Sequence, residues 1–265
     1  MAHVIGLIGD REARARIGDA LRGHATVTFC DAAAELIDTL ARAFVTAVVV
    51  ELRDCTGVST ASVIRCLREG FPSIPVVAYC SLTRATPHDI LTAAKAGASG
   101  LVLRGVDDTG VALRAALTSA ADDCVARRVM RALEDAAPGS VRPIIEYCIL
   151  HARNAPSVAQ VARALGISRK TLVNRLAAAG MPTPSAIIGW CRLLQAAQLI
   201  EDPKRSVERI AHELDFPSGA ALRNMLKRYT GLQPREVREN GGLCCVLHAF
   251  QRALTAGRPH PTSIG

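Results

Sequence analysis

The sequence predicts two halves of different fold class: an α/β doubly wound sheet of five parallel strands, followed by an all-α half with two similar pairs of helices. Two observations lead to this prediction. Short apolar runs alternate with amphipathic segments over the first 120 residues, and an apolar-periodic helix pair occurs twice after residue 140. Basic residues are also concentrated in the second half.

The composition limits the class of protein. Apolar residues make up 49% of the 265 residues and aromatic residues only 3%, so Ala, Val, Leu and Ile must build the cores. No apolar run reaches the roughly 18–20 residues that cross a bilayer, and the N-terminus does not read as a signal peptide. The nine cysteines are scattered and odd in number, as is usual in the reducing cytosol, and the histidines are dispersed too. We therefore expect a cytoplasmic protein without membrane association, metal or cofactor.

Five short apolar runs define the first half. They cover residues 3–9, 26–30, 47–52, 75–80 and 100–104. Strands that alternate with helices of about 10–15 residues form parallel βαβ units, and such sheets carry function at the carboxyl ends of their strands. Glu51 lies at the end of one of these runs, so we expect it at this edge of the sheet.

Glu51 is unusual because four apolar residues, 47–50, run directly into it. A strand this apolar is buried on both faces, and an unpaired buried carboxylate costs several kcal/mol. Our hypothesis is that Arg104 pairs with Glu51; the alternative is that Glu51 is solvated at the strand end. Cys80 is expected to be a buried structural cysteine and not a nucleophile, since no histidine is indicated nearby by spacing. The first strand also lacks a following Gly-x-Gly-x-x-Gly, which argues against a dinucleotide site.

The order and spacing of these strands, with IPVVAYCS (74–81) and AAKAGASGLVLRG (93–105), resemble the receiver domain of two-component response regulators over about residues 3–120. Receivers end the first strand with an acidic pair that binds magnesium, the third with the phosphoacceptor aspartate, the fourth with Thr or Ser and the fifth with Lys. Here the corresponding residues are Gly9 and Asp10, Glu51, Cys80 and Arg104. Only Asp10 matches, so the resemblance implies a pseudo-receiver with a degenerate site.

Residues 121–140 are predicted to form an amphipathic connector. Val125, Val129 and Leu133 recur on one helical stripe with charged residues elsewhere, and APGS (137–140) then ends the helix. The stripe either packs on the chain's own domains or forms a dimer seam. The sequence leaves both open.

The charge differs between the halves. Residues 1–140 contain 15 Lys+Arg and 16 Asp+Glu, whereas residues 141–265 contain 17 and 8. Within the second half, residues 151–200 carry six basic residues and no acidic one. This imbalance favours a polyanion as the partner of the second half alone.

Two stretches of the second half repeat one plan. In SVAQVARALGISRKTLVNRL (157–176), Gly166 permits the left-handed turn between two short helices. The plan returns in SVERIAHELDFPSGAALRNMLKRYTG (206–231), after an intervening helix at about 184–200. A helix, a short turn and a second helix with a polar outer face form a helix-turn-helix, which places its second helix in the major groove of DNA.

Two such units joined by one helix resemble the DNA-binding domain of AraC/XylS-type transcription regulators over about residues 141–240. The matching segments are VAQVARALGISRKTL, RLLQAAQLI and VERIAHELDF…LKRYTGLQPREVR. By position, the resemblance implies these base-reading residues: Lys170, Val173, Asn174, Ala220, Arg223 and Asn224. Phosphate contacts are expected from Ser168, Arg169, Arg175, Ser218, Lys227 and Arg228. Asp215 stands where the family usually has glycine, so we expect the second unit to sit differently or bind more weakly.

The sequence thus predicts a bacterial-type, sequence-specific DNA-binding transcription regulator that is not an enzyme. Its pseudo-receiver (1–120) would serve as a sensor, dimerisation or docking module without phosphorylation, and its tail (241–265) has no assigned role. The partners we consider are double-stranded DNA, a second copy through the connector or the receiver-like half, and RNA polymerase. Two alternatives stay open: a response regulator phosphorylated at an atypical site, and a small-molecule binder or enzyme that uses the strand-end crevice, with DNA binding as output.

Overall fold

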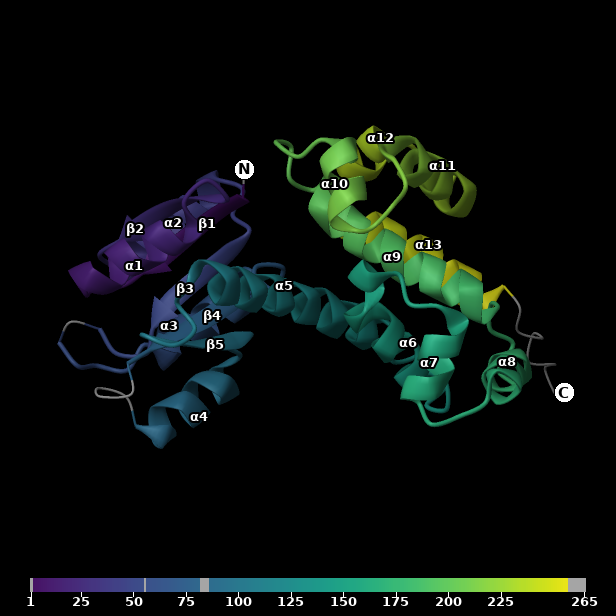
Figure 1. The fold of residues 1–265 in the computed structure, drawn as a ribbon, viewed down its shortest axis with the longest axis horizontal. Coiled ribbons are helices and arrows are strands. Elements are labelled where there is room, and N and C mark those ends of the chain that lie inside the picture. Colours follow the sequence, from purple (N-terminus) through teal and green to yellow (C-terminus); the bar gives the residue numbers. More distant parts are fainter. Residues whose placement is uncertain (1, 55, 82–85, 257–265) are drawn as a thin grey trace, which may run out of the picture. The chain divides into compact units, whose positions relative to one another are not determined.

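A computed structural model describes residues 2–54, 56–81 and 86–256, which form two compact units that divide after Cys124 (Figure 1). The first unit contains an all-parallel, five-stranded sheet with the strand order β2-β1-β3-β4-β5. Helices alternate with these strands along the chain. The predicted fold class, a doubly wound α/β sheet followed by an all-α half, is confirmed.

The elements of the first unit follow the predicted runs closely. The strands are β1 (Ala2–Leu7), β2 (Ala25–Cys30), β3 (Ala47–Glu51), β4 (Val76–Cys80) and β5 (Gly100–Leu103). The helices are α1 (Arg11–Leu21), α2 (Ala33–Arg42), α3 (Ala61–Gly70), α4 (Pro87–Ala96) and α5 (Gly110–Ala132). In the described residues, no helix is long and apolar enough to cross a membrane.

The central strand β3 is buried on both faces, as its unbroken apolar run predicts. Val48 and Val50 pack in a core with α2, α3 and α4, whereas Val49 packs in a second core with α1 and α5. All three valines are 0% exposed. Because helices cover both faces of the sheet, its polar chemistry is confined to the strand ends.

The second unit is all-α. Its helices are α6 (Arg142–Leu150), the 3-10 turn η1 (Ala152–Asn154), α7 (Val158–Ala164), α8 (Arg169–Ala178), α9 (Pro184–Ile200), α10 (Val207–Glu213), α11 (Gly219–Thr230), α12 (Pro234–Glu239) and α13 (Leu243–Thr255). Two short-helix pairs, α7–α8 and α10–α11, stand at the places where the sequence predicts helix-turn-helix units.

Helix α9 is the centre of this unit. Eleven of its seventeen residues are buried, which is the pattern of a helix surrounded by protein on most sides. Thr183 caps its N-terminus and Pro184 follows as the first helical residue. Figure 1 shows α7–α8 near one end of α9, α10–α11 near the other, and α13 alongside. One straight element therefore carries both pairs.

The predicted connector has a definite environment in the second unit. Its first part is the C-terminal portion of α5, and Val125, Val129 and Leu133 are at most 2% exposed in the core of the second unit. Of the two alternatives left open by the sequence, this stripe packs on the chain's own domain. It is therefore not free to form a dimer seam.

The tail contains α13, an element that the sequence left without a role. Phe250 is fully buried, and its ring stacks on that of Trp190 of α9 with 5.4 Å between the ring centroids. At the start of α13, the Leu243 amide donates to Glu201 Oε1 at 2.9 Å. Near its end, Gln251 Nε2 donates to the Ala132 carbonyl at 2.7 Å. The described part of the tail thus completes the core around α9.

Candidate DNA interface and the altered strand-end site

The second helix of the first pair, α8, is fixed at its start and along one side. Ser168 caps it, since its hydroxyl accepts from the Thr171 amide at 3.0 Å. Leu172 and Leu176 are at most 1% exposed and anchor the helix on the core. The remaining side chains that the sequence assigns to DNA are all exposed: Arg169, Lys170, Val173, Asn174 and Arg175. Val173 is an exposed large apolar residue, 46% accessible, as a contact to a thymine methyl requires.

Helix α11 repeats this arrangement. The Ser218 hydroxyl accepts from the Ala221 amide at 3.1 Å, and Leu222 and Leu226 are 0% exposed. Five of the six predicted contact residues are exposed: Ser218, Ala220, Asn224, Lys227 and Arg228. Both second helices therefore pair a buried leucine stripe with an accessible polar face.

Arg223, the predicted guanine reader of α11, already has a partner in the protein. Its Nη1 lies 3.0 Å from Oε1 of Glu208 in the first turn of α10. A hydrogen bond from Glu208's own backbone amide, and then the bond from Arg223, hold the pKa of this carboxyl below its usual range. A Cβ added to Gly219 would lie 2.6 Å from the same oxygen, so α11 begins tightly against Glu208. To contact a base, Arg223 must either leave Glu208 or bind the base while it stays paired with Glu208.

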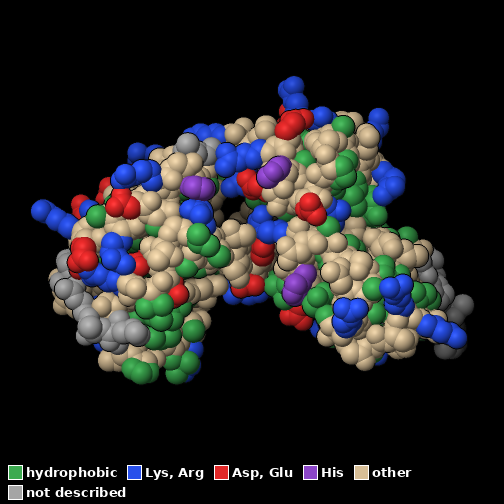
Figure 2. Space-filling view, viewed as in Figure 1, with side chains coloured by type: hydrophobic (Ala, Val, Ile, Leu, Met, Phe, Trp, Pro, Cys, Tyr) green, Lys and Arg blue, Asp and Glu red, His purple; other side chains and the backbone are tan. Residues whose placement is uncertain are grey.

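The charge on the second unit suits a polyanion. Residues 125–265 contain 20 Lys+Arg and 10 Asp+Glu. Figure 2 shows Lys and Arg side chains over the α7–α8 end of this unit. Such a surface attracts phosphates without regard to sequence, so base discrimination must come from the exposed faces of α8 and α11.

The turns of the two pairs have the same backbone conformation although their residues differ. Gly166 has φ 65° and Asp215 has φ 54°, both in the left-handed region. In each turn the amide of the next residue donates a hydrogen bond to the equivalent carbonyl: Ile167 to Ala162 at 3.0 Å, and Phe216 to Ala211 at 2.8 Å. An L-residue other than glycine costs about 1–2 kcal/mol in this conformation. The second turn therefore keeps the geometry of the first at an energetic cost.

Three residues that position these helices escaped the sequence analysis. They are Glu208, Gly189 and Arg192. A Cβ at Gly189 of α9 would lie 2.6 Å from the Tyr229 hydroxyl, so this glycine permits the close approach of α11. Arg192 donates to backbone carbonyls of the second turn. The sequence feature that could have indicated Arg192 is that α9 contains no other charged residue.

The four predicted residues lie at the carboxyl edge of the sheet, and Arg104 contacts two of them: Asp10 through its side chain, and Cys80 through its backbone amide, which donates to the Cys80 carbonyl at 2.8 Å. Asp10 caps α1, and its Oδ1 accepts from the amides of Glu12 and Ala13 at 2.8 and 3.1 Å. Arg104, just after β5, donates from Nη1 to Asp10 Oδ2 at 2.8 Å and from Nη2 to Glu12 Oε2 at 2.7 Å. Glu51 accepts at Oε2 from the Gly9 amide at 2.9 Å. Cys80 ends β4 and is 1% exposed.

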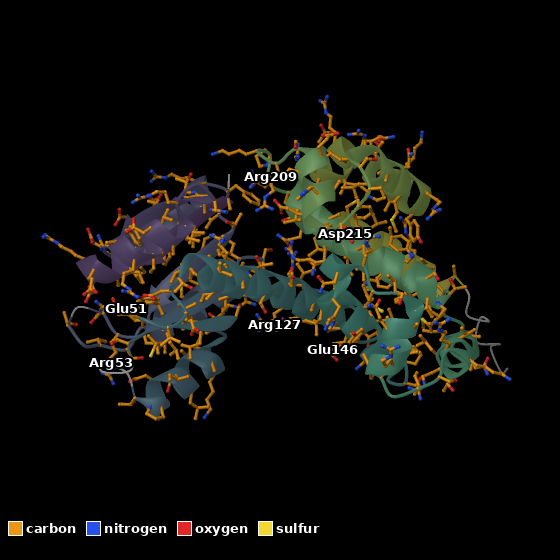
Figure 3. All side chains as sticks on the ribbon, in the orientation of Figure 1. Glu51, Arg53, Arg127, Glu146, Arg209 and Asp215 are labelled. Carbon is orange, nitrogen blue, oxygen red and sulfur yellow. The ribbon has the colours of Figure 1, made fainter. Side chains whose placement is uncertain are left out.

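The hypothesis that Arg104 pairs with Glu51 is wrong. Nη1 and Nη2 of Arg104 are directed to the start of α1, where Asp10 and Glu12 offer two carboxylates together. Glu51, labelled in Figure 3, is satisfied by a main-chain N–H and is partly exposed. Glu51 instead accepts from the backbone N–H of Gly9, and the two carboxylates of Asp10 and Glu12 occupy the Arg104 guanidinium.

In this arrangement the Arg104 cation offsets the negative charge of Asp10 that a divalent cation would otherwise meet. The hydrogen bond from Arg104 is the main cause that holds the pKa of Asp10 below its usual range. The described residues contain no group of three His, Cys, Asp or Glu side chains arranged to hold a metal ion. Burial raises the pKa of the Cys80 thiol, which disfavours the thiolate needed for nucleophilic attack.

Comparison with known proteins finds a family model for part of the second half. Residues 161–240 match a family model described as a helix-turn-helix domain, and this confirms the predicted AraC-type resemblance of that segment. No curated protein matches the chain significantly. The chain is therefore assigned to a class through its second half: it carries a helix-turn-helix DNA-binding domain.

Solved structures similar to the chain include response regulators. The chemotaxis response regulator CheY4 of Vibrio cholerae is 14% identical, with a TM-score of 0.39, over 45% of this chain and 98% of that one. A response regulator from Thermotoga maritima is 20% identical, with a TM-score of 0.39, over 46% and 98%. Full-length FixJ from B. japonicum is 16% identical, with a TM-score of 0.38, over 88% and 98%. The assignment of the first unit to the receiver-like class rests on its own strand order and not on these scores.

The Glu208–Arg223 pair generates a first prediction. Replacement of Glu208 by Gln should raise affinity for duplex DNA by up to about fivefold, because an exposed ion pair that holds Arg223 is worth 0.2–1 kcal/mol and a negative charge is also removed. Fluorescence anisotropy with a labelled duplex measures this change.

A matched control is Glu239→Gln, which opens the Arg235–Glu239 pair of α12, outside both helix pairs. The control should change affinity less than E208Q. A lower affinity for E208Q than for the unmodified protein would contradict the prediction and would mean that Glu208 prepares Arg223 for binding.

Proposed function

We propose that this protein is a sequence-specific DNA-binding transcription regulator that reads two half-sites, one with α8 and one with α11. The observation that carries the proposal is that both second helices are capped, anchored by buried leucines and exposed on their polar faces, on the single buried helix α9. Two recognition helices on one support can enter successive major grooves, about 34 Å apart.

Each base-reading role follows from side-chain chemistry. Asn174 and Asn224 can pair bidentately with adenine, and Lys170 and Arg223 with guanine, each worth about 1–3 kcal/mol of discrimination. The apolar side chains of Val173 and Ala220 fit a thymine methyl.

Phosphate contacts position the protein without specifying sequence. We assign them to the exposed cations that flank the base-reading residues: Arg169, Arg175, Lys227 and Arg228. Ser168 and Ser218 are occupied as helix caps, so their contribution to phosphate binding lies in holding the helix N-termini in place, where backbone N–H groups and the helix dipole favour an anion.

For the first unit we propose a pseudo-receiver that acts without phosphorylation, as a sensor, dimerisation or docking module. The supporting observation is the engagement of Arg104 with Asp10 and Glu12, together with the Gly9–Glu51 contact, in place of an acidic pair and an aspartate. The chain is then a regulator and not an enzyme, with DNA as its principal partner.

The regulator proposal predicts that the intact protein enriches one short bipartite site from sheared genomic fragments. Its affinity should fall steeply between two salt concentrations, because counterions are released from neutralised phosphates. The Asn174→Ala variant should lose about 5- to 150-fold at one position of the site, since a bidentate pair is worth 1–3 kcal/mol. Sequencing of the selected pools and equilibrium binding measure both effects.

Arg175→Ala and Arg235→Ala serve as controls. A phosphate contact at Arg175 predicts a uniform loss of affinity and a salt slope smaller by about one, whereas Arg235, 86% exposed on α12, should change neither. If no sequence is enriched, the basic surface binds polyanions in general and the proposed regulator function is wrong.

The pseudo-receiver proposal predicts no phosphoryl transfer from acetyl phosphate with magnesium. Intact-mass analysis should find the unmodified mass, because Glu51 is directed to the Gly9 amide and Asp10 is neutralised by Arg104. The quadruple variant G9D/E51D/C80T/R104K, which restores the receiver pattern, serves as the matched comparison. An added phosphate on the unmodified chain would contradict the proposal and favour a response regulator with an atypical site.

A further inference from the structure

The second helix-turn-helix turn contains a residue that is unfavourable where it stands. Asp215, labelled in Figure 3, has a left-handed backbone, and Ala155 is the only other non-glycine residue with positive φ in the part of the chain that the structure describes. The corresponding position of the first pair is Gly166, which adopts this conformation freely. Something other than the local sequence must hold the second turn closed.

Arg192 of α9 makes contacts that do this. Its Nη2 donates to the Leu214 carbonyl at 3.0 Å and to the Asp215 carbonyl at 2.9 Å. Its guanidinium carbon lies 3.9 Å from the centroid of the Phe216 ring. The Arg192 side chain therefore contacts three consecutive residues of the turn. The carbonyls at the end of α10 also carry partial negative charge, which a cation stabilises.

In the part of the chain that the structure describes, the turn of the first pair receives no such hydrogen bonds. Across residues 2–54, 56–81 and 86–256, no side chain donates a hydrogen bond to the carbonyls of Leu165 or Gly166. In the described residues the carbonyls of Leu165 and Gly166 therefore receive no side-chain hydrogen bond, whereas the aspartate turn is held by Arg192. The two pairs thus reach one backbone geometry by different means.

The placement of Arg192 is costly for the protein. Its Nε is buried without a hydrogen-bond partner, and burial lowers the pKa of the guanidinium. A buried donor without a hydrogen-bond partner costs free energy, so the other contacts of Arg192 must offset this cost. One turn earlier on the same helix, Gly189 admits the Tyr229 and Met225 side chains of α11. Arg192 and Gly189 together join α9 to the turn that precedes α11 and to the C-terminal part of α11.

We propose that Arg192 is a positioning residue that fixes the second recognition helix, α11, on α9 and so determines whether the second half-site is read. This inference rests on the proposed DNA-reading function and assigns a specificity role to a residue that does not touch DNA. It predicts energetic coupling between Arg192 and Asp215, because glycine at 215 would remove the need for the contacts of Arg192.

The test compares R192M, R192K, D215G and the double variant R192M/D215G, with R235M as a control that removes equal charge from an exposed site. Footprinting on the selected DNA scores each half-site separately. R192M should weaken protection of the second half-site by about tenfold, as for a lost charged hydrogen bond, and leave the first unchanged. R192K should protect the second half-site to an intermediate degree, because an ammonium cannot stack on the Phe216 ring as a planar guanidinium does. D215G should restore protection in the R192M background.

A second measurement needs no DNA and separates this inference from the proposed function. Hydrogen exchange of the intact variants should quicken in residues 207–230 for R192M, remain normal in residues 158–178, and recover in R192M/D215G. Equal loss at both half-sites, exchange that quickens throughout the second unit, or no rescue by D215G would each overturn the inference. If no DNA site exists, the exchange pattern alone still decides whether Arg192 positions α11.

Discussion

The burial of α9 is the constraint on which the rest of the second unit depends. The helix contributes residues such as Leu193, Leu194 and Ala197, each 0% exposed, to a core shared by α6, both helix pairs and α13. Because the same helix contacts both pairs, the spacing of α8 and α11 is set by its length and by the few residues that dock each pair on it. Gly189 and Arg192 dock the second pair, and α13 covers the side of α9 that would otherwise lack a partner.

The first unit keeps a receiver-like architecture while its strand-end chemistry has changed. Parallel βαβ topology depends on the apolar runs and the helices that cover them, and these are intact. The strand-end residues contribute little to that topology, so they can change without loss of the fold. Arg104 provides a fixed positive charge for Asp10 and Glu12, so the edge is stabilised by an internal cation.

The sequence alone predicted the features of the fold that depend on a local pattern of residues. Strands such as β3 were visible because burial on both faces forces a continuous apolar run, and α8 and α11 because serine caps precede leucines at helical spacing. It was not sufficient where side chains from distant segments meet. The partner of Arg104 depended on which of several carboxylates lay within reach of the guanidinium.

The same limit applies to other contacts made in three dimensions. The buried carboxylate of Asp108 accepts from Arg16 Nε at 2.6 Å and from the Tyr79 hydroxyl at 2.8 Å. No pattern in the sequence predicted these contacts. Arg192 was visible as a lone charge in an apolar helix, but its target lies 22 and 23 residues further along the chain.

The most direct test of the account is to vary the spacing between the two half-sites of the selected DNA. Because α8 and α11 share one buried helix, insertion of about five base pairs, half a helical turn, should turn the second half-site to the other face of the duplex. Affinity measured by equilibrium binding should then fall to that of a single half-site. An affinity that does not change with spacing would contradict the claim that one rigid support presents both recognition helices to DNA.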